Sequence, residues 1–85
     1  MIRARDIRNG KLCERRMVND AKSNGYDVVK IPFGADFIEM RPRQKPRFVE
    51  VKYGCGPISK TQEKTKKFVE SLGMKYDVRR CACDL

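Results

Sequence analysis

Two full charges, Glu50 and Lys52, interrupt the otherwise apolar stretch RFVEVKYG, which spans residues 47–54. The β-forming residues of this stretch and the glycine that ends it predict a strand. Because side chains alternate across a strand, both charges are expected on one face, together with Phe48. Burying an unpaired carboxylate is expensive, so Glu50 needs either a cationic partner or a metal ion.

Two further acidic residues are also predicted at positions where a carboxylate would be partly buried and would need a partner. Glu14 falls inside the apolar arc of a helical pattern, and Asp36 stands at the start of a second predicted strand. An internal salt bridge from Lys52 to Glu50 or Asp36 is one explanation, but a single lysine cannot neutralise three carboxylates. The excess negative charge favours the binding of a divalent cation. Since the chain has no histidine, hard oxygen ligands favour Mg²⁺ or Mn²⁺ over zinc.

The elements that must position these residues follow from hydrophobic periodicity and from turn residues. A basic arm is expected over residues 1–10, and a helix over 11–24 with Cys13, Met17, Val18 and Ala21 on one stripe. Strands are predicted at 26–32, 36–41, 47–53 and 75–81. A second helix over 59–72 is expected to bury one face, made of Thr61, Thr65, Phe68, Val69 and Leu72.

The composition narrows the class of protein. The chain has 85 residues, which suits one domain, and carries 20 basic against 11 acidic residues, a formal charge of +9. This basicity predicts a polyanionic partner, nucleic acid before membrane. No apolar run approaches the roughly 18 residues of a membrane span, so an intracellular, cytoplasmic protein is expected.

The cysteines leave several states open. Cys13, Cys55, Cys81 and Cys83 form an even set, but nothing in the sequence suggests secretion. The C-x-C spacing of the last pair is not the usual zinc spacing. Buried or free thiols are therefore favoured, with a zinc or iron–sulfur site and disulfides as the alternatives.

Three short motifs in this element order resemble a known superfamily. The segment GAD, the strand VEVK and the helix start SKTQ are similar to the PD-(D/E)XK nucleases, which share an α-β-β-β-α-β core with a mixed sheet. Within that superfamily the stretch RNGKLCE is most similar to the start of archaeal-type Holliday junction resolvases. One departure is that GAD stands where a proline is expected before the acid.

The resemblance implies a role for each matching residue. Asp36, Glu50, the carbonyl of Val51 and the helix-borne Glu14 would be metal ligands, for Mg²⁺ or Mn²⁺. Lys52 would be the catalytic lysine, and it would orient or activate the attacking water and stabilise the developing negative charge.

Gln62 has two interpretations that stay open. The resemblance implies a glutamine that supports the lysine or the water. The spacing Ser59-x-x-Gln62 instead predicts a capping box at the start of the second helix. Of the remaining candidates, Glu39 is expected to be a surface or pairing residue, and Tyr53 a core residue.

The implied activity is a structure-selective DNA endonuclease, and a junction resolvase would act as a homodimer because symmetric cleavage needs two sites. The chain leaves no room for a separate recognition domain, so recognition of branched DNA by shape is expected. The alternatives are a flap, nick or single-strand nuclease of the same superfamily, and a non-catalytic basic protein that binds nucleic acid. The candidate DNA contacts are basic residues: Arg3, Arg5, Arg8, Arg41, Arg43, Lys45 and Lys60.

Overall fold

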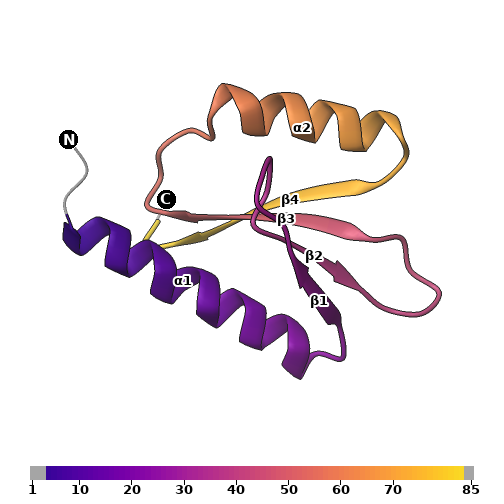
Figure 1. Cartoon of the computed structure of the whole chain (residues 1–85), viewed down its shortest axis with the longest axis horizontal. Coiled ribbons are helices and arrows are strands. Elements are labelled where there is room, and N and C mark those ends of the chain that lie inside the picture. The colour runs from indigo at the N-terminus through magenta and orange to yellow at the C-terminus, as the bar shows by residue number, and fades with distance from the viewer. Residues whose placement is uncertain (1–3, 84–85) are drawn as a thin grey trace.

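The computed structural model describes residues 4–83, and the side chains of residues 8–83. Two helices and a mixed sheet make an α+β fold in the element order that the sequence predicts (Figure 1). The strands predicted at 47–53 and 75–81 are confirmed to the residue, and the other elements are shorter or longer at their ends. The elements are α1 (Ala4–Ser23), β1 (Asp27–Lys30), β2 (Phe37–Met40), β3 (Arg47–Tyr53), α2 (Lys60–Ser71) and β4 (Lys75–Cys81).

Helix α1 begins earlier than expected. The predicted basic arm over residues 1–10 is wrong from Ala4 onward, where the chain is already helical. No proline interrupts this segment, and Gly10 inside a helix costs only about 1 kcal/mol relative to alanine. The helix ends at Ser23, and Gly25 follows with φ 86°, a conformation that suits glycine. Arg3 lies outside the described residues.

The sheet order is β1-β2-β3-β4. The first three strands are antiparallel neighbours, whereas β3 and β4 pair in parallel, with Lys52 opposite Arg80. A parallel pair needs a crossover connection, and α2 provides it. Figure 1 shows α1 along one side of the sheet and α2 on the other.

Alternation along β3 sends its side chains into two separate cores. Val49 is fully buried in the cluster beneath α1, with Val18, Ala21 and Phe37. Phe48 points the opposite way and packs on the α2 side, against the cluster of Ala35, Val69 and Tyr76. The predicted stripe of the first helix is therefore confirmed: Cys13, Val18 and Ala21 are buried.

The predicted buried face of the second helix is mostly wrong. Of its members only Val69 is buried, while Phe68 is 65% and Leu72 57% exposed. Val69 is the one residue of α2 in the described core cluster on this side of the sheet, so Phe68 and Leu72 stay outside it. Tyr53, expected in the core, is also 43% exposed at the end of β3.

All four cysteines are paired. Cys13 on α1 is bonded to Cys81 at the end of β4, and Cys55 is bonded to Cys83. The preference for free thiols was therefore wrong, and no free cysteine remains among the described residues. The sequence could not decide this, because the pairs are 68 and 28 residues apart along the chain and meet only in the fold.

Within residues 4–83, neither helix combines the length and the apolar character needed to cross a membrane.

Candidate active site

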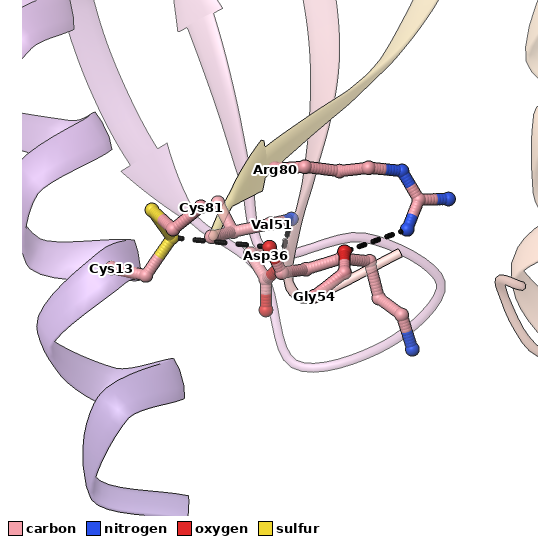
Figure 2. The surroundings of a disulfide bond; sticks show 7 residues. Cys13, Asp36, Val51, Gly54, Arg80 and Cys81 are labelled. Atoms are coloured by element: carbon pink, nitrogen blue, oxygen red, sulfur yellow. Dashed lines mark hydrogen bonds between the residues drawn. A yellow bond between two sulfur atoms is a disulfide. The ribbon is translucent and has the colours of Figure 1, made fainter. Parts of the chain in front are cut away.

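Asp36 and Glu50 come together from neighbouring strands. The backbone N–H of Asp36 donates to the carbonyl of Val49 over 2.9 Å, next to the last register pair of β2 and β3, Phe37 and Val49. The carboxyl groups of Asp36 and Glu50 lie within hydrogen-bonding reach of each other. Oδ2 of Asp36 accepts a hydrogen bond from the N–H of Val51 at 2.6 Å (Figure 2).

Glu50 is almost completely buried, with 4% of its surface exposed. Its Oε1 accepts a hydrogen bond of 2.6 Å from the side-chain amide of Gln62. The carbonyl oxygen of the same Gln62 accepts from the N–H of Ser59 at 2.7 Å, and the Ser59 hydroxyl accepts from the N–H of Gln62 at 3.2 Å. The capping-box interpretation of Gln62 is therefore confirmed. The same side chain also contacts Glu50, whereas its implied support of the lysine or the water stays a prediction.

The environment of Glu50 favours its protonated form. Burial, then the charge of Asp36 and hydrogen bonding with it, raise the pKa of Glu50 to about 7, against a smaller lowering effect from Lys52. A carboxyl group that resists ionisation beside a second carboxylate is typical of a functional site. A nearby cation would offset both the burial of Glu50 and its repulsion by Asp36, because a cation stabilises the ionised form of each acid.

Glu14 lies at the periphery of this site. Its charge raises the pKa of Glu50 less than any other group named there. Its carboxylate is 3.9 Å from the ammonium group of the exposed Lys30, a long ion pair that contributes little to stability. Among the described side chains of residues 8–83, no group of three or more His, Cys, Asp or Glu residues is arranged to hold a metal ion. The structure thus brings Asp36 and Glu50 together and leaves Glu14 farther out.

The loop that precedes Asp36 is held by a buried tyrosine. The hydroxyl of Tyr76 on β4 donates to the carbonyl of Gly34 at 2.6 Å. Gly34 has φ +84°, and a Cβ at this position would lie 2.6 Å from Oγ1 of Thr65 on α2. Burial and the charges of Glu50 and Asp36 raise the pKa of Tyr76 to about 12, so this donor stays protonated. Only glycine allows the loop to approach α2 this closely.

The Cys13–Cys81 disulfide stands beside the site. It joins the helix residue that precedes Glu14 to the strand next to β3 (Figure 2). Sγ of Cys13 lies 4.0 Å from the carbonyl oxygen of Lys52. Because a disulfide sulfur carries no hydrogen, this is a packing contact. The covalent link therefore fixes α1 against β4, the neighbour of the strand that carries Glu50 and Lys52.

The opposite face of the sheet contains a separate charged cluster. Glu39, expected to be a surface or pairing residue, is 2% exposed and pairs with Arg47 at 3.1 Å and with Arg79. Its hydrogen bonds are the main reason why the pKa of Arg79 is raised. Asp77 also accepts from Arg79, at 2.9 Å. The pairing interpretation is confirmed and the surface interpretation is wrong.

The predicted DNA contacts do not form one patch. Arg41, Arg43 and Lys45 belong to the β2–β3 connection, beyond the Arg47 end of β3, and Lys60 begins α2 at the other end of that strand. Arg41 stacks on Tyr26 at 4.5 Å, and Lys45 donates to the carbonyl of Gly73 at 3.1 Å. Of the N-terminal residues, Arg8 is exposed on α1, and Arg3 and the side chain of Arg5 are outside the description.

Two residues of β4 that were not among the predicted site residues lie next to the site. Tyr76 holds the loop before Asp36, and Arg80 is the register partner of Lys52. A signal was present for Arg80, because it shares its strand parity with Tyr76 and Val78, both packed on the α2 side. A charge on that apolar face is the pattern that identified Glu50.

The fold has a counterpart among solved structures. The chain is similar to Hjc from Archaeoglobus fulgidus, a Holliday junction resolvase from an archaeal hyperthermophile, with a TM-score of 0.57 and 16% sequence identity. The similarity covers 80% of this chain and 67% of the resolvase chain. Over the matched part, the mixed four-stranded sheet with two helices shares the fold of that structure. No protein-family model matches the sequence, and no curated protein matches it significantly.

Proposed function

We propose that this protein is a metal-dependent endonuclease that hydrolyses phosphodiester bonds in DNA. The observation that carries the proposal is the pairing of Asp36 with the buried Glu50, whose pKa is raised to about 7. Such a pair is costly without a cation. The fold shared with a junction resolvase adds independent support.

The donor atoms suit Mg²⁺ or Mn²⁺. Both carboxylates offer hard oxygen ligands, and Mg²⁺ is usually held by one or two carboxylates together with water and substrate phosphate. Asp36 and Glu50 would hold the ion, with the carbonyl of Val51 as a further ligand and Glu14 acting through water. When bound, the cation supplies Lewis acidity and lowers the pKa of a water molecule.

The chain's own residues account for the remaining tasks. The N–H of Val51 holds Asp36, and Gln62 holds Glu50, each over 2.6 Å, so neither carboxylate has to be ordered when substrate arrives. Lys52 extends from the same face of β3 as Glu50 and carries a fixed positive charge. This charge would stabilise the negative charge that develops on the phosphate and would orient the attacking water.

Branched DNA is the substrate class that we propose. The net charge of +9 favours a polyanion, and the scattered basic residues suit contact with several DNA arms better than contact with one duplex face. Hjc, which shares the fold, is a Holliday junction resolvase. Resolution of a junction would place this chain in recombination or repair of DNA.

Symmetric cutting of a junction requires a homodimer. Phe68, in the last turn of α2, and Leu72, the C-cap residue of that helix, are four residues apart, and both are more than half exposed. We propose that this apolar stripe contacts a second copy of the chain. Phe68→Glu should give a monomer by light scattering, whereas Val29→Glu, on the exposed edge strand β1, should leave the mass unchanged. Equal masses for the two variants would contradict this surface.

A cleavage assay tests the activity. A synthetic four-way junction and a linear duplex of the same sequence are incubated with the protein in MgCl₂, in MnCl₂ and in EDTA. The proposal expects paired nicks in the junction that require the metal. Asp36→Asn, Glu50→Gln and Lys52→Ala should each lower the rate at least about 100-fold, whereas Glu63→Gln, on the exposed side of α2, should cut normally.

Other outcomes separate the alternatives. Equal cutting of duplex and junction would remove the junction preference and leave the nuclease. A preference for flaps, nicks or single strands would assign a different substrate to the same site. Tight binding with no cleavage in either metal would contradict the enzyme and indicate a nucleic-acid-binding protein.

A further inference from the structure

Arg80 lies beside the catalytic lysine candidate on the next strand. It is the register partner of Lys52 in the parallel ladder of β3 and β4. Partners in such a ladder point to the same face, and neighbouring strands are about 4.8 Å apart. The face is the α2 side, because Val78, two residues before Arg80, packs there. Arg80 and Lys52 therefore project from the face that carries Glu50.

This arrangement is electrostatically unfavourable in the free protein. Like charges directly across from each other on paired strands destabilise a sheet. Among the side chains that the structure describes, those of residues 8–83, no carboxylate lies within ion-pair distance of either Lys52 or Arg80. The adjacent Arg79, which points to the other face, is neutralised by Glu39 and Asp77. The chain thus pairs its charges on one face of β4 and leaves two cations together on the other.

The guanidinium of Arg80 is held in place by the loop that follows β3. Its Nη1 donates to the carbonyl of Gly54 at 3.1 Å and to that of Gly56 at 2.6 Å, and Figure 2 shows the first of these bonds. The Cys55–Cys83 disulfide restrains the same loop. An arginine has five N–H donors in a planar fork, so Nε and Nη2 keep donors beyond these two carbonyls. A fork oriented in this way matches two phosphate oxygens.

We propose that Arg80 is a further catalytic residue, which binds non-bridging oxygens of the DNA phosphate placed at the Asp36–Glu50–Lys52 site. This inference rests on the proposed nuclease function and names the group that holds its substrate. The phosphate would neutralise the pair of cations on β3 and β4. Arg80 would contribute most as negative charge builds on the phosphate, because its donors are already oriented.

The test combines a protein variant with a DNA variant. Binding of a junction by wild type and by Arg80→Gln is measured in EDTA over a range of salt concentrations, so that no cleavage occurs. Losing one phosphate contact should lower the slope of log Kd against log salt by about 0.9. In Mg²⁺ the same change should lower kcat about 10-fold to 100-fold. Lys75→Gln, at the other end of β4, is the matched control and should change neither.

A purely structural role for Arg80 makes a different prediction. If it only anchors the loop, Arg80→Gln lowers the melting temperature and the cleavage rate but leaves the salt slope equal to that of the control, which overturns the proposal. For the case that Arg80→Gln does not fold, Arg80→Lys keeps the charge and should keep the slope. If the slope for Arg80→Lys falls by about 0.9, as for the loss of a whole phosphate contact, the proposal is also overturned.

The intact wild-type chain provides a second measurement. A junction with a neutral methylphosphonate at the cut position should bind wild type more weakly and should bind Arg80→Gln no worse than unmodified DNA does. Equal losses for both proteins would contradict the contact. If wild type does not cleave and the slope still falls, the nuclease function fails and the phosphate contact stands. If wild type cleaves and Arg80→Gln leaves the slope unchanged, the nuclease function stands and the phosphate contact of Arg80 is refuted.

Discussion

Gln62 connects the start of α2 to Glu50 through the two ends of one amide group. Its nitrogen donates to Glu50 over 2.6 Å, and its oxygen accepts from the N–H of Ser59 over 2.7 Å. The helix cap and the buried carboxylate are therefore positioned by the same side chain. A change at Gln62 affects both, but different substitutions separate the two roles.

Gln62→Glu should keep the helix and damage the site. Glutamate at this position still completes a capping box and suits the helix N-terminus. It also places a second negative charge against Glu50, which should lower cleavage at pH 7 about 10-fold. Ser59→Ala should do the opposite: it costs about 1 kcal/mol of stability and leaves the contact with Glu50. Thermal melts and cleavage rates of the two variants measure this, and normal cleavage by Gln62→Glu would refute the role.

The stability of the metal-free protein should depend on Glu50 between about pH 4.5 and 7. The pKa of Glu50 is raised from 4.5 to about 7 by burial and by Asp36. In this range the folded chain binds more protons at Glu50 than the unfolded chain, so the contribution of this group falls as pH rises and is lost above about pH 7. Glu50→Gln removes the titration and keeps an acceptor for Gln62.

The Glu50→Gln variant should accordingly be more stable than wild type at pH 8, by on the order of 2 kcal/mol. At pH 4 the two proteins should be similarly stable. Urea titrations in EDTA at the two pH values test this. Asp27→Asn, on exposed β1, is the control. A Glu50→Gln variant that is no more stable than wild type at pH 8 would show that the burial of Glu50 is not costly.

The two disulfides should contribute unequally to stability. In the chain-entropy description, a cross-link stabilises by restricting the unfolded chain, and more so for longer loops. The Cys13–Cys81 bond joins residues 68 apart, and the Cys55–Cys83 bond joins residues 28 apart. These separations correspond to about 4.4 and about 3.6 kcal/mol. Replacing Cys13 and Cys81 by alanine should cost more than replacing Cys55 and Cys83 by serine.

Equilibrium unfolding of the two double variants measures which pair contributes more to stability. A reducing agent should lower the unfolding midpoint of wild type but not that of a chain that lacks all four cysteines. The first pair also holds α1 next to Lys52, so its loss should lower cleavage as well. A wild-type midpoint that is insensitive to reductant would contradict both statements.

Glu39→Gln should destabilise the protein by about 2–3 kcal/mol. The carboxylate is buried and pairs with Arg47 and Arg79. Glutamine removes its charge and one of its two acceptor oxygens, so Arg47 loses its ion pair and Arg79 keeps only Asp77. The cost stays moderate because both arginine side chains are partly exposed, 31% and 23%. Cleavage at a temperature where the variant is folded should be close to normal, since Glu39 lies on the other face of the sheet. A strong loss of activity in the folded variant would contradict this separation.

The sequence alone determined the element order, the bounds of β3 and β4, and the placement of Glu50 and Lys52 on one face. These properties depend on periodicity and on turn residues, which act over a few positions along the chain. The stripe of α1 follows for the same reason. The same local rules predicted the wrong buried face for α2, because a pattern of apolar positions does not say how much core is available to cover them.

Only the tertiary structure decided which side chains meet. The bond from the N–H of Val51 to Asp36 depends on strand register, and the contact of Gln62 with Glu50 depends on how α2 packs on the sheet. Cysteine pairing is undetermined in the same way, since four cysteines allow three pairings. Contacts of this kind join residues that are distant along the chain, and their energies depend on burial and on neighbouring charges, which exist only after folding.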